Sequence, residues 1–303
     1  MNFFKKLFGG AQETPQEEKA HQEAKDFDVL KYDGVAALRQ HQVEYAIKCF
    51  RHALDMKDDL ETRDYLSQAL IQNNELLAAY EQLQKLAEAQ PDNLGIWMRM
   101  SEVAYMMEDY GTMADCCEKA KLLDKDDPRV NYNYARACLG QGDQINAIAM
   151  LTKAIAVNQK AVEEEKKEGV GYFYDAYLLR GQTLLKMGDV TNAEQDADFL
   201  MQHVEGNEDI LMLKARCQEA GGHHDEAIQT FTKVIEANPF CADAFRERGA
   251  IRLAQGDKDG AEEDARSVLE INPELADGHH EAEGTEDIAA KVQQAYKNVN
   301  PFA

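Results

Sequence analysis

Two consecutive stretches of 34 residues decide the fold: YDAYLLRGQTLLKMGDVTNAEQDADFLMQHVEGN, residues 174–207, and EDILMLKARCQEAGGHHDEAIQTFTKVIEANPFC, residues 208–241. They align without a gap. The eighth position is small in both, Gly181 and then Ala215, and the twentieth is alanine in both, Ala193 and Ala227. A period of about 34 residues with a turn signal near its middle is typical of stacked pairs of helices.

The same register extends outward over most of the chain. Small residues recur at intervals of 33, 34, 34, 46, 34 and 34 residues, namely Gly34, Ser67, Ser101, Ala135, Gly181, Ala215 and Gly249. Twelve residues after each of them come Ala46, Ala79, Met113, Ala147, Ala193, Ala227 and Ala261. The places sixteen and nineteen residues after each small residue contain only apolar residues. This register predicts seven repeats, over 27–59, 60–93, 94–127, 128–161, 174–207, 208–241 and 242–275.

The spacing within a repeat has a physical meaning. Positions 4, 7, 8 and 11 share one face of a helix, and in the third repeat they are Trp97, Met100, Ser101 and Ala104. The small eighth residue lets a second helix approach closely, and a larger one would force the two helices apart. Turn signals lie between the two predicted helices, in the pairs Gly142-Asp143, Gly188-Asp189 and Gly256-Asp257.

With these positions the chain resembles the tetratricopeptide repeat family over residues 27–275. The resemblance implies an all-α fold, a right-handed α-solenoid of about seven helical hairpins whose first helices line a concave groove that binds a partner. Two positions depart from the family pattern: Asp33 replaces a large apolar residue in the first repeat, and Met113 replaces alanine in the third.

Three segments lie outside the regular period. We expect residues 1–26 to be a flexible or peripheral N-terminal segment, because residues 11–26 are polar and highly charged and read as a loose linker or an extra solvated helical turn. The surplus residues at 160–173 predict that the second helix of the fourth repeat runs on until Gly169 and Gly171 end it, as a solvated extension or as a binding or dimer element. Residues 276–303 predict a C-terminal capping helix, beginning near Thr285, followed by a tail. The oligomeric state does not follow from these patterns.

Charge and composition narrow the function. The formal net charge is −23, which disfavours binding to nucleic acid. The six cysteines form no CxxC pair, so we expect a reduced, cytoplasmic protein. There is no GxxxxGK[ST] phosphate loop and no HExxH sequence, and we predict no cofactor, no metal site and no catalytic residues. The expected function is that of a non-enzymatic protein–protein interaction scaffold.

The resemblance places positions 2, 5, 9 and 12 of each repeat on the groove. The candidate partner-binding residues at these positions are Met98, Tyr105, Arg129, Tyr132, Arg136, Gln182, Met212, Arg216 and Arg246. Aromatic, Met and Arg side chains are common interface anchors. Arginine binds carboxylates bidentately, which suits a protein or peptide partner with acidic groups. The alternative is that these arginines pair with Asp and Glu of their own chain.

Two other functions remain open from the sequence. Phe3, Phe4, Leu7 and Phe8, with Lys5 and Lys6 among them, could form a short interfacial helix, making the chain a peripheral membrane adaptor tethered by residues 1–10. The chain could also be an accessory subunit of an enzyme complex. Membrane contact is expected only through this N-terminal segment.

Overall fold

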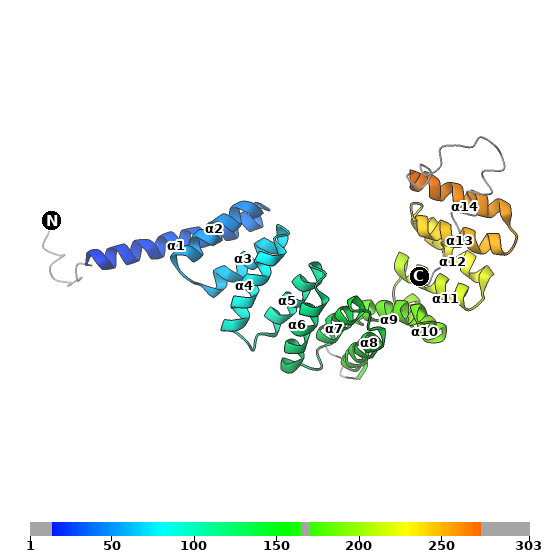
Figure 1. The fold of residues 1–303 in the computed structure, drawn as a ribbon, viewed down its shortest axis with the longest axis horizontal. Coiled ribbons are helices and arrows are strands. Elements are labelled where there is room, and N and C mark those ends of the chain that lie inside the picture. Colours follow the sequence, from blue (N-terminus) through cyan, green and yellow to red (C-terminus); the bar gives the residue numbers. More distant parts are fainter. Residues whose placement is uncertain (1–13, 165, 167–169, 274–303) are drawn as a thin grey trace. The chain divides into compact units, whose positions relative to one another are not determined.

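The repeated pattern forms helices, and no strand occurs among the residues that the computed structural model describes, 14–164, 166 and 170–273 (Figure 1). Within these residues there are 14 α-helices. Their bounds are α1 Pro15–Arg39, α2 Val43–Met56, α3 Leu60–Gln72, α4 Leu76–Ala89, α5 Leu94–Met106, α6 Tyr110–Leu123, α7 Pro128–Gly140, α8 Gln144–Gln159, α9 Tyr174–Lys186, α10 Val190–His203, α11 Glu208–Ala220, α12 His224–Ala237, α13 Ala242–Ala254 and α14 Lys258–Ile271.

The chain divides into two compact units, which we call the N-terminal unit, residues 1–141, and the C-terminal unit, residues 142–303. In the N-terminal unit α1, α3 and α5 each pack against the helix that follows, as hairpins, and α7 packs on α6. In the C-terminal unit α9, α11 and α13 do the same, and α8 packs on α9. From α3 onward, each first helix begins at the residue where a predicted repeat begins. The all-α solenoid fold is thereby confirmed.

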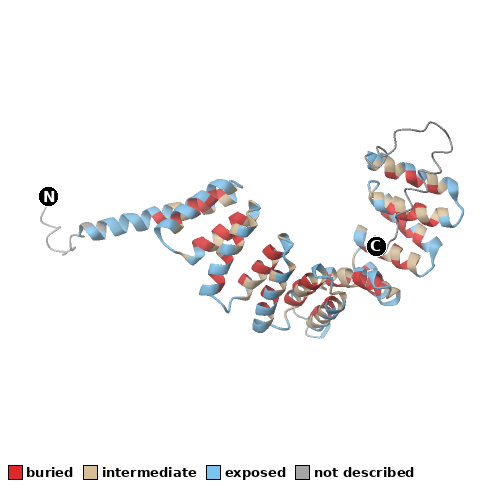
Figure 2. Ribbon diagram, in the orientation of Figure 1, coloured by how far each residue is buried: buried red, intermediate tan, exposed pale blue. Residues whose placement is uncertain are grey.

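The core follows the repeat register. Every residue at the eighth, twentieth, twenty-fourth and twenty-seventh positions of the seven repeats is buried. Figure 2 shows buried positions recurring along both units, with exposed residues at many helix ends and turns. A Cβ added to Gly181 would lie 2.8 Å from Cδ2 of Leu213 and 3.5 Å from the carbonyl oxygen of Ala193. The absence of a side chain is therefore what allows α9 and α10 to meet at this point.

The turns inside the hairpins share a residue with positive φ just before the second helix, and in several of them an aspartate follows that caps this helix. Gly188 and Gly256 have φ values of 83° and 88°. The carboxylates of Asp189 and Asp257, which follow them, accept hydrogen bonds from the backbone N–H groups of Asn192 and Gly260. The predicted Gly-Asp signals therefore end one helix and begin the next.

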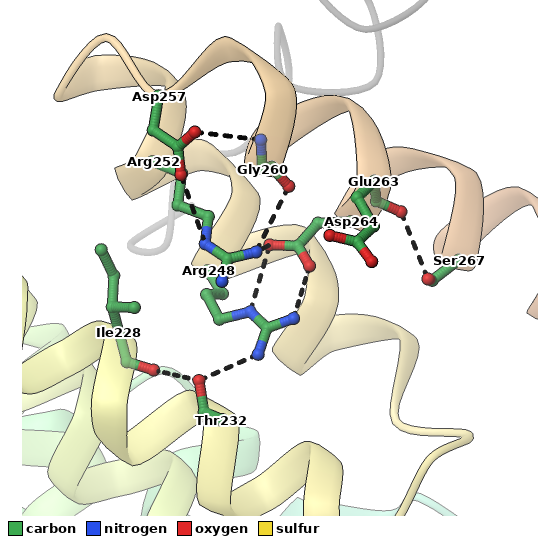
Figure 3. Close-up of polar contacts among 9 residues, drawn as sticks. All are labelled: Ile228, Thr232, Arg248, Arg252, Asp257, Gly260, Glu263, Asp264 and Ser267. Atoms are coloured by element: carbon green, nitrogen blue, oxygen red, sulfur yellow. Dashed lines mark hydrogen bonds and ion pairs between the residues drawn. The ribbon is translucent and has the colours of Figure 1, made fainter.

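A cluster of ionic and hydroxyl groups ties α13 to both of its neighbours (Figure 3). The guanidinium of Arg248 donates to Asp264 at 2.6 and 3.1 Å and to the hydroxyl of Thr232 at 2.9 Å. Arg252 donates to the same carboxylate at 3.0 Å. Asp264 is 1% exposed, so these two arginines replace the water that its charge would otherwise need.

The N-terminal segment is helical in the part that the structure describes. Helix α1 begins at Pro15 and continues without a break into the first hairpin. Thr14 and Glu17 form a capping box, in which each side chain binds the backbone N–H of the other residue. Pro15 occupies the first turn, where its missing N–H costs nothing. Residues 1–13 lie outside the described residues.

The irregular segment after the fourth repeat is helical at its start, but the helical part ends at Glu164 and Lys166 is not helical, so it does not run on to Gly169 and Gly171. A short π-helical turn over Lys160–Glu164 continues α8. The side-chain amide of Asn158 then accepts from the backbone N–H of Phe173 at 2.8 Å and donates to the carbonyl of Gly171 at 3.1 Å. These two bonds anchor the returning chain where α9 begins. Gly169 and the predicted capping helix of residues 276–303 lie outside the described residues.

Among the described helices, none is long and apolar enough to cross a membrane.

Candidate partner-binding surface

The first helices carry a series of ion pairs that join each hairpin to the next. In the N-terminal unit Lys31 of α1 binds Glu61 of α3 at 2.5 Å, Asp64 of α3 binds Arg99 of α5, and Glu102 of α5 binds Arg136 of α7 at 3.0 Å. In the C-terminal unit Arg216 of α11 binds Glu247 of α13. We call the side of the first helices that carries these pairs the first-helix surface of each unit.

Two tyrosines surround one of these pairs in the N-terminal unit. The guanidinium of Arg136 lies over the Tyr105 ring, 3.7 Å from its centroid, and 5.8 Å from the centroid of Tyr132. Its Nη1 donates to both carboxylate oxygens of Glu102, and the Asn133 amide donates to Glu102 at 2.7 Å. Cation–π contact and charge-assisted bonds therefore hold Arg136 in one position. We call Tyr105, Tyr132 and Arg136 the tyrosine–arginine patch.

The Tyr105 ring of the patch is accessible to solvent and packs against a neighbouring aromatic side chain. Tyr105 is 38% exposed, and its ring makes an edge contact with Tyr110 at a centroid distance of 6.1 Å. The Arg136 side chain is 19% exposed, so the patch presents mainly the tyrosine ring. Met98 is half-buried about one turn before Glu102 on α5, and Arg129 is exposed at the start of α7. Of the predicted residues in this unit, the structure joins Tyr105, Tyr132 and Arg136 directly.

The predicted residues of the C-terminal unit have different environments. Arg216 donates three hydrogen bonds to Glu247 at 2.6–3.1 Å, and Arg246 pairs with Asp243 at 2.5 Å. Gln182 is exposed on α9. Met212 is 6% exposed and belongs to a core cluster with Phe231 of α12 and other apolar side chains. The expectation that Met212 presents an exposed anchor is therefore wrong, because this side chain fills the core between neighbouring hairpins.

The four predicted arginines all have carboxylate partners in their own chain. Arg129 pairs with Asp127 at 2.7 Å, and Arg136, Arg216 and Arg246 pair with the acids already described. The alternative reading of self-pairing is therefore confirmed for each arginine. A partner with acidic groups would have to displace these internal carboxylates, so the arginines give no support to an acidic partner.

One functional candidate was missed by the sequence reasoning. Glu219 occupies position 12 of the sixth repeat, in the last turn of α11, and is half-buried. The pKa of the Glu219 carboxyl is raised to about 7. Burial is the main cause, the nearby Glu247 carboxylate also raises the pKa, and Arg216 lowers it. Within the described part of the chain its side chain has no hydrogen bond and no ion pair. The repeat register itself would have found it, since position 12 belongs to the predicted groove set.

The cysteines show no sign of activation. Five of the six are buried, and Cys241 is half-buried. Burial raises the pKa of Cys117 and of Cys217 to about 12, so both thiols are protonated at neutral pH. These side chains act as small apolar residues in the helix packing.

Comparison with known proteins agrees with the repeat register. A family profile described as Tetratricopeptide repeat matches residues 178–237 and 212–276, and a second profile with that description matches residues 128–160. The curated "Tetratricopeptide repeat-containing protein trd-1" of Caenorhabditis elegans is 25% identical over 114 residues, or 37% of this chain. The match spans 15% of that protein's own length.

Solved structures share the fold. A tetratricopeptide repeat protein from Parabacteroides merdae superposes with a TM-score of 0.62 at 14% identity, covering 90% of this chain and 100% of that one. PilW, a type IV pilus biogenesis factor, gives 0.60 at 18% identity over 71% and 94% of the two chains. YrrB, described as having an unusual peptide-binding site, gives 0.53 at 17% identity over 70% and 97%. The repeated helical hairpins and the family matches together show that residues 128–160 and 178–276 are similar to tetratricopeptide repeats.

Proposed function

We propose that this protein is a non-catalytic scaffold that binds a protein or peptide partner through the tyrosine–arginine patch. The observation that carries the proposal is the exposed Tyr105 ring, held in place by the guanidinium of Arg136. Tetratricopeptide repeat folds generally mediate protein–protein interaction. YrrB, which shares this fold, is described as having a peptide-binding site.

The chemistry of the patch favours a particular kind of contact. Glu102 neutralises Arg136, so the patch offers a flat aromatic face and a guanidinium plane with little net charge. Such a surface gains energy from aromatic, proline or aliphatic side chains that stack on it. Because Arg136 and Tyr105 are already ordered, binding loses less side-chain entropy than it would on a mobile surface.

Affinity capture from an extract of cells that make the protein tests this proposal. We compare the intact chain, Tyr105→Ala and the control Leu77→Ala, which removes an apolar side chain 68% exposed on α4. A partner of the patch should be recovered with the intact chain and the control, and its affinity for the purified Tyr105→Ala protein should fall about tenfold or more. Equal affinity of the two variants for that partner would exclude the patch.

A further inference from the structure

We infer that the outer face of the first hairpin binds an amphipathic α-helix of a partner protein, one with the apolar spacing that α2 has. This face consists of Val29, Tyr32 and Ala36 on α1, and we call it the N-terminal end face. The tyrosine–arginine patch lies on other helices, α5 and α7. The inference therefore goes beyond the proposed function and does not depend on it.

The end face occupies repeat positions that are buried in every other repeat. Positions 3 and 10 are separated by about two turns and so share one side of a first helix. Both are buried from the second repeat, with Thr62 and Ala69, to the seventh, with Ala244 and Ile251. In the first repeat position 3 is Val29, which is 57% exposed, and the residue at position 10 is exposed as well. The end face also includes position 6, where the tyrosine is 67% exposed.

The element that buries these positions elsewhere is the second helix of the preceding hairpin. Ala244 and Ile251 of α13 share a core cluster with Phe231 of α12. Val103 of α5 shares another with Leu83 of α4. Helix α1 is the first described helix, so the described part of the chain supplies no second helix before it. The end face therefore continues the surface between hairpins, with its helical neighbour left out.

The side chains of the end face indicate which kind of second helix it accepts. At the equivalent positions the second repeat carries Thr62, Tyr65 and Ala69. Valine and threonine are both β-branched and similar in size, and the tyrosine and the alanine are the same in the two repeats. The end face is therefore nearly a copy of the surface that α3 presents to α2.

Helix α2 shows how such a surface is covered. The Phe50 ring stacks on Tyr65 at a centroid distance of 5.8 Å and an interplanar angle of 16°. Ala46 and Phe50 share a core cluster with Ala69. A helix with alanine and phenylalanine at this spacing finds equivalent contacts on the end face, including the Tyr32 ring. Because α2 itself is engaged by α3, the helix that covers the end face comes from a partner.

A peptide with the sequence of α2 tests the inference on the full chain. The probe is residues 42–57, QVEYAIKCFRHALDMK, with Cys49→Ser to prevent oxidation, and the comparison peptide carries Phe50→Ala in addition. Both peptides have the same charge, so attraction to the acidic protein affects them equally. In NMR titrations of the isotope-labelled protein, we expect the probe to shift amide signals of α1 and to bind about fivefold or more tightly than the comparison peptide.

Variants of the protein locate the binding. Val29→Asp with Ala36→Asp places two charges on the end face, and Leu77→Asp with Ile145→Asp places two at apolar positions that are 68% and 72% exposed elsewhere. Probe binding should be lost with the first pair and kept with the second, with circular dichroism confirming that each protein is folded. The milder Tyr32→Ser should weaken binding about fivefold. Equal binding to both pairs, or equal affinity of the two peptides, would overturn the inference.

Other ways of covering the end face give distinct results. If residues 1–13 covered it, the probe would bind only after deletion of residues 1–10. If a second copy covered it, sedimentation would show a dimer, and the α1 signals would change on dilution. Either result would contradict the inference. Tyr105→Ala should leave probe binding intact, so failure here is distinguishable from failure of the proposed patch.

Discussion

Single side chains set the distance between paired helices, and Gly34 is the clearest example. A Cβ added at this position would lie 2.5–2.9 Å from three ring atoms of Phe50. Phe50 is fully buried and belongs to a cluster that includes Leu66 and Leu70. Since the ring is enclosed on α2, it has little room to move away from a new methyl group.

Gly34→Ala should therefore destabilise the N-terminal unit by about 1–3 kcal/mol, because overpacking strains a closed core. Gly111→Ala is the matched control: a Cβ there would meet only Asp109, at 3.5 Å, and alanine favours helix. We expect the control to be neutral or stabilising by up to about 1 kcal/mol. Urea unfolding followed by circular dichroism measures both, and destabilisation of equal size in the two variants would contradict the packing argument.

Glu219 predicts a pH dependence with a definite sign. Its pKa in the folded state, about 7, lies above the ordinary value of 4.5. The folded protein therefore holds this proton more tightly than the unfolded chain, and the associated stability, present below pH 4.5, is lost as pH rises through 7. Glu219→Gln should match the parent near pH 4.5 and exceed its stability at pH 8 by about 2 kcal/mol, which is less than the full shift corresponds to because solvent screens a half-buried carboxyl. A stability difference that stays constant across this range would refute the assignment.

The repeat positions of the candidate site residues could be predicted from the sequence, but their ion pairs within the chain and their burial could not. The register correctly places Tyr105, Tyr132 and Arg136 together on successive first helices. It could not tell that Glu102 and Glu247 would neutralise the arginines, because that depends on side-chain reach across neighbouring hairpins. Met212 was misplaced for a similar reason, since helix periodicity does not show how deeply the next hairpin covers a given position.

At the scale of helices, buried ionic clusters recur at equivalent repeat positions. Arg180 donates to Asp196 at 2.6 and 2.9 Å and to Thr152 of the preceding helix at 3.1 Å. Arg248, Asp264 and Thr232 occupy the same positions two repeats later and make the same bonds. Each cluster therefore fixes a first helix both to its own second helix and to the preceding hairpin.

Asp264→Ala tests how much such a cluster contributes. It leaves Arg248 and Arg252 without their shared carboxylate, and we expect a loss of about 3–5 kcal/mol. The control Arg266→Ala breaks an exposed pair with Glu262 on the same helix and should cost less than about 1 kcal/mol. Urea unfolding gives both values. A small effect of Asp264→Ala would show that the arginines find water or other acids.

At the scale of the whole molecule, the division at residues 141 and 142 has a measurable consequence. Trp97 is the only tryptophan, it lies on α5 of the N-terminal unit, and its indole donates to the carbonyl of Pro91 at 2.8 Å. Its fluorescence therefore reports one unit, whereas circular dichroism reports the helices of both.

We expect Asp264→Ala to lower the midpoint seen by circular dichroism while leaving the Trp97 fluorescence midpoint unchanged. Gly34→Ala should move the fluorescence midpoint. Repeat proteins are stabilised by contacts between neighbours, so a change in one unit need not pass to the other. Coincident shifts of both signals with Asp264→Ala would show that the chain unfolds as one cooperative body.

Most of the fold could be predicted from the sequence, because the same pattern of small and apolar residues recurs in each repeat. Alanine at position 20 and a small residue at position 8 identify the hairpins even where single positions depart, as at Met113, which is fully buried in place of alanine. The start of α1 could not be predicted in this way, because residues 15–26 have no repeat partner and their helix depends on the local cap at Thr14.

That extended start of α1 has a practical meaning. Every described side chain from Gln16 to Asp26 is exposed, and Phe27 is the first to enter the core. The twelve helical residues 15–26 rise about 18 Å. This part of α1 therefore separates Thr14 from the packed hairpins by that length. A fluorophore or affinity handle attached at Thr14 would stand off from the packed helices by that length, which makes this end the natural place to immobilise the protein.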